Sequence, residues 1–260
     1  MKTILITGAT QGLGRATAQA LAEQGHALIL HGRDAQKLAE TADDLRRFGT
    51  QVQTELADLS DLSDAAAMAA RLIALQQPID VLINNAGVFK TAQTRAGRFD
   101  VRFAVNTLAS ALLATRLHPL IPRDGRIIHL SSAAQASVDP QALDGNRSLQ
   151  DMEAYAQSKL AITLWSQAFA DSHPDGPVSL AVNPGSLLAT RMVREGFGTS
   201  GNNLNIGVDI LTQAALSRDF ATASGRYYDN DAGRFAPRFP DAQAQEITQQ
   251  VDSLLSDIGA

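Results

Sequence analysis

Short apolar runs rich in β-branched residues alternate with longer helical stretches along almost the whole chain, and this alternation constrains the fold most. Seven runs have the composition of strands: residues 3–7, 27–31, 52–56, 81–84, 126–130, 178–182 and 226–228. Six stretches show helical periodicity: residues 15–24, 35–48, 64–76, 98–117, 151–172 and 242–255. Such alternation indicates a parallel sheet covered by helices, and nearly continuous apolar strands are typical of a sheet buried on both faces. We therefore predict a doubly wound α/β fold with about seven mainly parallel strands and helices on both faces.

The 260 residues contain no Pro-, Gly- or Ser-rich linker, so we predict a single domain over residues 1–260. Two segments, residues 133–153 and 186–207, have weak periodicity and follow predicted strands, and we expect them to be loops. In open α/β sheets ligands bind outside the carboxyl ends of the strands. These two segments are therefore expected to contact a substrate.

Composition excludes several classes of function. The chain has no cysteine, which excludes disulfides, thiolate metal sites and cysteine nucleophiles, and its 5 histidines lack metal-ligand spacing, so we expect no metal. A net charge of −5 without a basic run disfavours nucleic acid as a partner. No apolar segment approaches the roughly 18 residues of a membrane span. The first apolar run stops too early for a signal peptide, so we expect a cytoplasmic protein without a membrane partner.

A glycine-rich turn follows the first predicted strand and leads directly into a helix. We expect cofactor contacts from its residues Gly8, Thr10, Gln11, Gly12, Leu13 and Gly14. Glycines permit a tight turn and a close approach of phosphate to the backbone, and a helix N-terminus offers free N–H groups to a pyrophosphate. The pattern is typical of a Rossmann-type dinucleotide site, although alone it also fits a tight turn without a ligand. No Gly-Lys-Ser/Thr follows, which disfavours a nucleotide-hydrolase loop.

The end of the second predicted strand favours NADP(H) over NAD(H). A carboxylate usually stands here when the ribose 2′-hydroxyl of NAD is bound, whereas this strand ends His31-Gly32-Arg33. Arg33 can pair with a 2′-phosphate, or it is simply a solvated surface charge. We expect Asp34 to cap the following helix rather than to bind a ribose.

Five further features follow in order along the chain. These are Asn84-Asn85-Ala86-Gly87 at the end of the fourth predicted strand, Asn106 in a helical run, Ser131-Ser132 after the fifth strand, Tyr155 and Lys159 four residues apart in a helix, and Asn183-Pro184-Gly185 after the sixth strand. Together with the glycine turn, this ordered set resembles the short-chain dehydrogenase/reductase family, in its shorter single-domain branch, from residue 3 to about residue 228. The resemblance implies an NAD(P)-dependent oxidoreductase that interconverts an alcohol with an aldehyde or ketone.

The resemblance also implies roles for individual residues. Tyr155 would be the acid/base, Lys159 its activator, Ser132 rather than Ser131 the group that polarises the carbonyl, and Asn106 a support of the proton relay. Further cofactor contacts are implied for Asp58, Leu59, Asn85, Ala86, Gly87, Val182, Pro184, Gly185 and Thr190, together with Tyr155 and Lys159. Relatives commonly pair through the helices that carry Asn106 and Tyr155, so a homo-oligomer is a further expectation.

The proposed acid/base chemistry can be examined from the residues themselves. Tyr155 and Lys159 are four apart on a helix and so share a face. A tyrosine has an ordinary pKa of about 10, and an ammonium about 4 Å away is worth roughly 4 kcal/mol at an effective dielectric of 20. We therefore expect Lys159 to bring the pKa of Tyr155 near 7, where proton transfer is efficient.

The substrate itself is not defined by the motifs. The long segment before Tyr155 and the later run Gly225–Asn230 resemble the retinol-dehydrogenase-like group, but without an expected membrane anchor the resemblance does not make retinoids the substrate. Residues 187–197 are a candidate lid with Leu188, Met192, Val193 and Phe197 as apolar contacts. Arg191 and Arg194 either bind an anionic group there or are solvated.

Two other functions remain open at this point. The same fold could serve a dinucleotide-binding sensor without turnover, since fold does not determine function. An epimerase or dehydratase is the third possibility, although such relatives usually differ in glycine spacing and have a larger C-terminal region. The intact set Ser132, Tyr155 and Lys159 favours the oxidoreductase.

Overall fold

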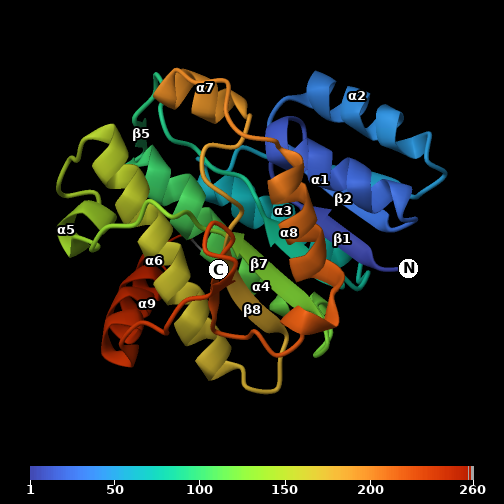
Figure 1. Ribbon diagram of the computed structural model, residues 1–260. Helices are drawn as coiled ribbons and strands as arrows, with labels where there is room; N and C mark the ends of the chain where they lie inside the picture. The colour runs from blue at the N-terminus through green and yellow to red at the C-terminus, as the bar shows by residue number, and fades with distance from the viewer. Residues whose placement is uncertain (257, 259–260) are drawn as a thin grey trace.

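The computed structural model describes residues 1–256 and residue 258, and its centre is an eight-stranded sheet (Figure 1). The strands, in their order across the sheet, are β10 (Arg234–Phe235), β9 (Tyr227–Asp229), β8 (Val178–Asn183), β7 (Arg126–Leu130), β4 (Val81–Asn84), β1 (Thr3–Ile6), β2 (Ala27–Gly32) and β3 (Val52–Leu56). Seven of them pair in parallel, and β10 pairs antiparallel with β9. The predicted α/β fold with about seven mainly parallel strands is confirmed.

Helices cover both faces of this sheet (Figure 1). The nine α-helices are α1 (Gly12–Glu23), α2 (Ala35–Arg46), α3 (Leu62–Ala74), α4 (Ser110–Leu117), α5 (Pro140–Leu143), α6 (Asp151–Ser172), α7 (Arg191–Phe197), α8 (Asn205–Leu216) and α9 (Asp241–Ser256), counted over the described residues. Shorter elements are a π-helix (Phe103–Ala109), two 3-10 turns (His118–Leu120 and Arg218–Phe220) and a small hairpin, β5 (Arg95–Ala96) with β6 (Phe99–Asp100).

Successive strand residues enter opposite cores, which explains why the strands read as continuous apolar runs. In β1, Ile4 and Ile6 pack in the core that α1, α2 and α8 cover, whereas Leu5 packs in the core of α3, α4 and α6. All three side chains are fully buried. Side chains alternate across a strand, so a sheet covered on both faces favours apolar residues on both faces of each strand.

The predicted loops are only partly loops. The segment 133–153 contains α5 and the first turn of α6, and the segment 186–207 contains α7 and the start of α8. The helix α8 was not predicted because Gly207 and several β-branched residues give it weak intrinsic helix propensity. Packing stabilises it instead: Val208, Leu211 and Ala215 are buried, and a side chain at Gly207 would meet Leu188 and Leu13.

The helix α9 lies along α6, on the side away from the sheet (Figure 1). The Trp165 indole N–H donates to Asp252 Oδ1 at 3.1 Å, and Gln167 donates to the carbonyl oxygen of Phe239. As a result α6 is buried almost all round within one chain. Pairing of two copies through this helix, which the resemblance implied, stays a prediction.

Candidate active site

A cavity of about 1000 Å³ extends along the carboxyl edge of the sheet. Every residue for which a catalytic or cofactor contact was expected lines this cavity, except Asn106 and Val182. These lining residues are Gly8, Thr10, Gln11, Gly12, Leu13, Gly14, Arg33, Asp58, Leu59, Asn85, Ala86, Gly87, Ser132, Tyr155, Lys159, Pro184, Gly185 and Thr190. Val182 is fully buried inside β8 instead. The strand order explains the assembly, because β1, β2, β3, β4, β7 and β8 all end at this edge.

The glycine turn is packed so closely that side chains would not fit. Gly8 and Gly12 adopt positive φ angles of 65° and 55°, and a Cβ at Gly14 would lie 2.4 Å from both Gly8 O and Asn85 Nδ2. Asn85 Nδ2 donates to the carbonyl oxygens of Thr7 and Gly8 at 2.7 and 3.2 Å. The predicted contact residue Asn85 thus shapes the turn from the neighbouring strand.

The start of α1 has the properties of an anion site. The Gln11 side chain makes no capping hydrogen bond within the described part of the chain, and Gly12, Leu13 and Gly14 at the start of the helix line the cavity. The first N–H groups of a helix lack partners within it and can bind an anion. Thr190 faces the turn from the other side, with its Cγ2 3.6 Å from the position of a Cβ at Gly12. A glycine cradle closed in this way fits a dinucleotide pyrophosphate.

The far end of the cavity carries a cation at the tip of β2. Arg33 is exposed and lines the cavity together with Asp58. Asp34 accepts from Lys37 N at 3.1 Å and caps α2, as predicted. The Asp58 carboxylate accepts from Ser60 N and Ser60 Oγ at 2.9 and 2.8 Å, which holds the segment that follows β3.

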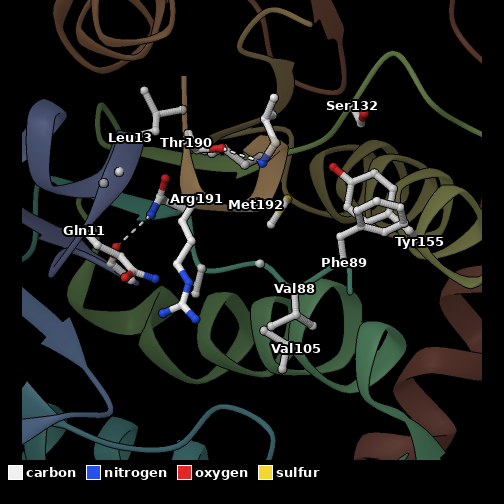
Figure 2. Close-up of a pocket in the computed structure, with 18 of the residues that line it drawn as sticks. Gln11, Leu13, Val88, Phe89, Val105, Ser132, Tyr155, Thr190, Arg191 and Met192 are labelled. Atoms are coloured by element: carbon white, nitrogen blue, oxygen red, sulfur yellow. Dashed lines mark hydrogen bonds between the residues drawn. The ribbon is translucent and has the colours of Figure 1, made fainter. Parts of the chain in front are cut away.

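Tyr155, Ser132 and Lys159 meet at the opposite end, where β7 ends beside α6. The Tyr155 hydroxyl points toward the region of the cavity where Ser132 lies (Figure 2). Ser131 is turned away and bonds Thr163 Oγ1 at 2.7 Å, so the geometry agrees with the choice of Ser132. Lys159 Nζ donates to Leu130 O at 2.7 Å and lies 5.7 Å from the centre of the Tyr155 ring.

The pKa values of Tyr155 and Lys159 differ from the expectation. Burial raises the pKa of Tyr155 above its ordinary value, and a hydrogen bond with Ser132 only partly offsets this. Burial also lowers the pKa of Lys159 to about 8. The expected pKa near 7 for Tyr155 was therefore wrong for the protein without a cofactor. The spacing of Tyr155 and Lys159 on a helix reveals neither their desolvation nor the distance between their charged groups.

Asn106 lies behind the cavity rather than in its wall. It is buried in the π-helix, where its Oδ1 accepts from Val88 N at 2.8 Å and its Nδ2 donates to Ser158 Oγ at 2.9 Å. Ser158 in turn donates to Tyr155 O at 2.7 Å. Asn106 therefore connects the loop after β4 to the helix that carries Tyr155.

Several residues that sequence reasoning missed also form the wall. The Phe89 ring packs against the Tyr155 ring with centroids 5.1 Å apart, and Val105 lies nearby (Figure 2). Met152, three residues before Tyr155 in α6, also lines the cavity. The only available signal for Phe89 was its place two residues after Asn-Asn-Ala-Gly. A side chain at Gly196 would meet the Phe89 ring at 2.7 Å, so the candidate lid α7 packs directly on this aromatic.

The two arginines of the lid differ in position. Arg191 lines the cavity and pairs with Glu195 at 2.6 Å, whereas Arg194 is exposed and outside the lining residues of the described chain. Of the expected apolar contacts, Leu188, Met192 and Val193 line the cavity, and the side chain of Phe197 lies outside the described part of the structure.

Residues 1–256 and 258 contain neither a metal-binding cluster nor a membrane-spanning helix. No cluster of three or more His, Asp or Glu side chains could hold a metal ion, and no helix there has both the length and the apolar character needed to cross a membrane.

Proteins of similar sequence and structure are dehydrogenases and reductases. The family described as short chain dehydrogenase matches residues 2–199. Human retinol dehydrogenase 13 is 30% identical over 274 residues, which cover 96% of this chain and 82% of that protein. A Streptomyces protein provisionally named daunorubicin C-13 ketoreductase DnrU is 32% identical over 242 residues, which cover 88% of this chain and 83% of that protein.

A solved structure from Beutenbergia cavernae shows the same fold. That protein is provisionally named an NAD(P)-dependent gluconate 5-dehydrogenase and contains NADP at low occupancy. It is 25% identical, superposes with a TM-score of 0.74, and the match covers 89% of this chain and 96% of that one.

Proposed function

The chain belongs to the short-chain dehydrogenase family and is an oxidoreductase acting on CH–OH groups, and from this premise we propose that it uses NADP(H) to interconvert an alcohol with an aldehyde or ketone. One observation carries the proposal. A single cavity joins the glycine turn and Arg33 at one end to Ser132, Tyr155 and Lys159 at the other.

The chain's own residues supply the proton chemistry. When bound, the nicotinamide supplies or accepts the hydride. In the reducing direction Tyr155 gives its hydroxyl proton to the carbonyl oxygen as the hydride reaches the carbon, and in the oxidising direction it takes the proton back. The Ser132 hydroxyl donates a hydrogen bond to the same oxygen as negative charge grows on it.

Lys159 and Asn106 support these two groups. The Lys159 ammonium stabilises the phenolate that Tyr155 becomes after it releases its proton. Asn106 holds the loop after β4 against the helix of Tyr155, through Val88 and Ser158. The raised pKa of Tyr155 keeps its proton available for reduction at neutral pH.

Lys159 should impose a pH dependence on carbonyl reduction. Its pKa is lowered to about 8, so the ammonium is present below that pH and is lost as the pH rises through it. We expect kcat/KM for reduction to be level below about pH 8 and to fall above it, because this parameter reports the ionisations of the free enzyme. Lys159→Met should give low values of kcat/KM that do not change with pH. If kcat/KM of the parent protein stays level up to about pH 9.5, roughly 1.5 units above the Lys159 pKa, the assignment is wrong.

Arg33 should determine the choice between the two dinucleotides. A hydrogen bond to a charged group contributes about 1.5–3 kcal/mol, so Arg33→Ala should weaken NADPH binding roughly tenfold to a hundredfold and leave NADH binding nearly unchanged. Titration calorimetry with both dinucleotides measures this. Arg15→Ala is the matched control, because Arg15 is also exposed but pairs with Asp44 on α2. Equal affinities of the parent protein for NADPH and NADH would show that Arg33 has no such role.

An NADPH-oxidation screen over aldehydes and ketones tests the function as a whole. We expect turnover with at least one apolar carbonyl compound, because Phe89, Val105, Met152 and Met192 line the cavity near Tyr155. NADPH binding without turnover on any of them would favour the dinucleotide-binding sensor instead.

A further inference from the structure

His31 is a buried histidine that the proposed reaction does not use. It lies near the carboxyl end of β2, two residues before Arg33, lines the cavity and is only 3% exposed. Both of its ring nitrogens have partners in the chain. Gly8 N donates to Nδ1 at 3.1 Å, and Nε2 lies 3.0 Å from Ala57 O.

These partners determine the tautomer. A backbone N–H can only donate, so Nδ1 must accept from Gly8 and cannot carry a hydrogen. The ring hydrogen is therefore on Nε2, which donates to the carbonyl oxygen of Ala57. The imidazole is neutral with both nitrogens occupied. Burial, which is the largest influence on the group, lowers its pKa and favours the same neutral form.

The ring connects two segments that are far apart in sequence. Gly8 begins the glycine turn with a φ of 65°, and Ala57 immediately precedes Asp58 in the segment after β3. The backbone adds two bonds at the same place, from Ala9 N to His31 O at 2.9 Å and from Ala57 N to Gly32 O at 3.2 Å. Both segments line the cavity on either side of Arg33.

Without the ring, the Gly8 N–H would lose its acceptor in a closely packed turn. A Cβ at Gly8 would already lie 3.0 Å from Ala86 Cα, so the turn has little room to move toward another acceptor. A buried donor without a partner is costly, and displacement of the turn would relieve it. The turn that receives the pyrophosphate is thus held in place from β2.

We propose that His31 is a positioning residue for the dinucleotide, which holds the glycine turn and the Asp58 segment at a fixed separation through its two ring nitrogens. The inference rests on the proposed function, because it assumes that this end of the cavity holds the dinucleotide. It assigns to His31 an effect on cofactor affinity, without any contact of its ring nitrogens with the cofactor.

Three substitutions separate the two hydrogen bonds. Asparagine places an acceptor near the position of Nδ1, so His31→Asn retains a partner for Gly8 N. Glutamine extends to the position of Nε2, so His31→Gln retains a donor for Ala57 O. His31→Leu retains neither. We expect His31→Leu to raise the Kd of NADPH about tenfold or more, and His31→Asn to restore most of the affinity.

His26 offers a matched control at the other end of the same strand. Lys2 N donates to His26 Nδ1 at 3.1 Å, which is the same kind of bond at the same length, and His26 lies outside the lining residues of the described chain. His26→Leu should leave the Kd of NADPH within about twofold of the parent value. Calorimetric titration with NADPH of all folded variants gives the comparison.

The outcomes distinguish this inference from the proposed function. A parent protein that binds NADPH, together with a folded His31→Leu variant of equal affinity, would overturn the role of His31 and leave the function intact. If His31→Leu does not fold, His31→Asn and His31→Gln decide, because Kd values equal to that of the parent protein for both variants would likewise overturn it. A parent protein that binds neither NADPH nor NADH would overturn the proposed function, and this inference with it.

Discussion

Replacement of Tyr155 by phenylalanine should reduce turnover at least about a hundredfold while NADPH binding stays unchanged. The change removes only the hydroxyl, which points toward the region of the cavity where Ser132 lies, and it retains the ring that packs against Phe89 (Figure 2). No proton donor then stands at the carbonyl oxygen, although the glycine turn and Arg33 are untouched. Initial rates of NADPH oxidation and calorimetric titration measure the two quantities separately.

Tyr228→Phe is the control for that experiment. The Tyr228 ring packs against Phe220 and Phe235 at one edge of the sheet, and the residue lies outside the lining residues of the described chain. It should keep full turnover. Unchanged turnover in Tyr155→Phe would remove the proposed mechanism.

Replacement of Arg102 by methionine should lower the free energy of unfolding by about 3–5 kcal/mol. The Arg102 side chain is only 1% exposed, and it bonds both oxygens of Asp100 at 2.8 and 2.7 Å and Asp151 at 2.6 Å. It also donates to the carbonyl oxygen of Phe89 at 3.1 Å. Methionine would leave the buried Asp100 carboxylate without its cation, and urea denaturation measures the loss.

Arg147→Met is the matched control for stability. Arg147 pairs with Asp139 at 2.6 Å, but the Arg147 side chain is 63% exposed, so its loss should cost at most about 1 kcal/mol. Equal losses of unfolding free energy in the two variants would show that burial of the Arg102 ion pairs adds nothing to stability. Because Arg102 holds Phe89 and the first residue of α6, we also expect Arg102→Met to weaken catalysis.

Most strands were predictable because both faces of the sheet are covered. The runs that became β1, β2, β4, β7 and β8 carry apolar residues on both faces, as strands of a sheet covered on both sides do. The helix α8 was not predicted, since its own residues only weakly favour a helix. Its formation depends on partners in α1 and on Leu188, which lie far away in the sequence.

The candidate site was predictable where it consists of short motifs. The glycine turn, Asn85 and the pair Tyr155 and Lys159 each occupy one local segment, and their order along the chain predicted the family to which the chain belongs. Residues whose role depends on a distant partner were not found. Arg102 binds Phe89 and Asp151, and His31 binds Gly8 and Ala57, across separations that no local pattern reveals.

The order of apolar runs and motifs by itself therefore determined the α/β fold, the family and the residues at the carboxyl edge. Local patterns suffice for these because backbone conformation and side-chain alternation depend on neighbours in the sequence. Only the tertiary structure decided which groups are desolvated and which distant groups meet. It raised rather than lowered the pKa of Tyr155, brought Arg102 to two carboxylates, and enclosed His31 between two segments of the cavity. Burial and long-range distance arise from packing of the whole chain, and electrostatic energies depend on both.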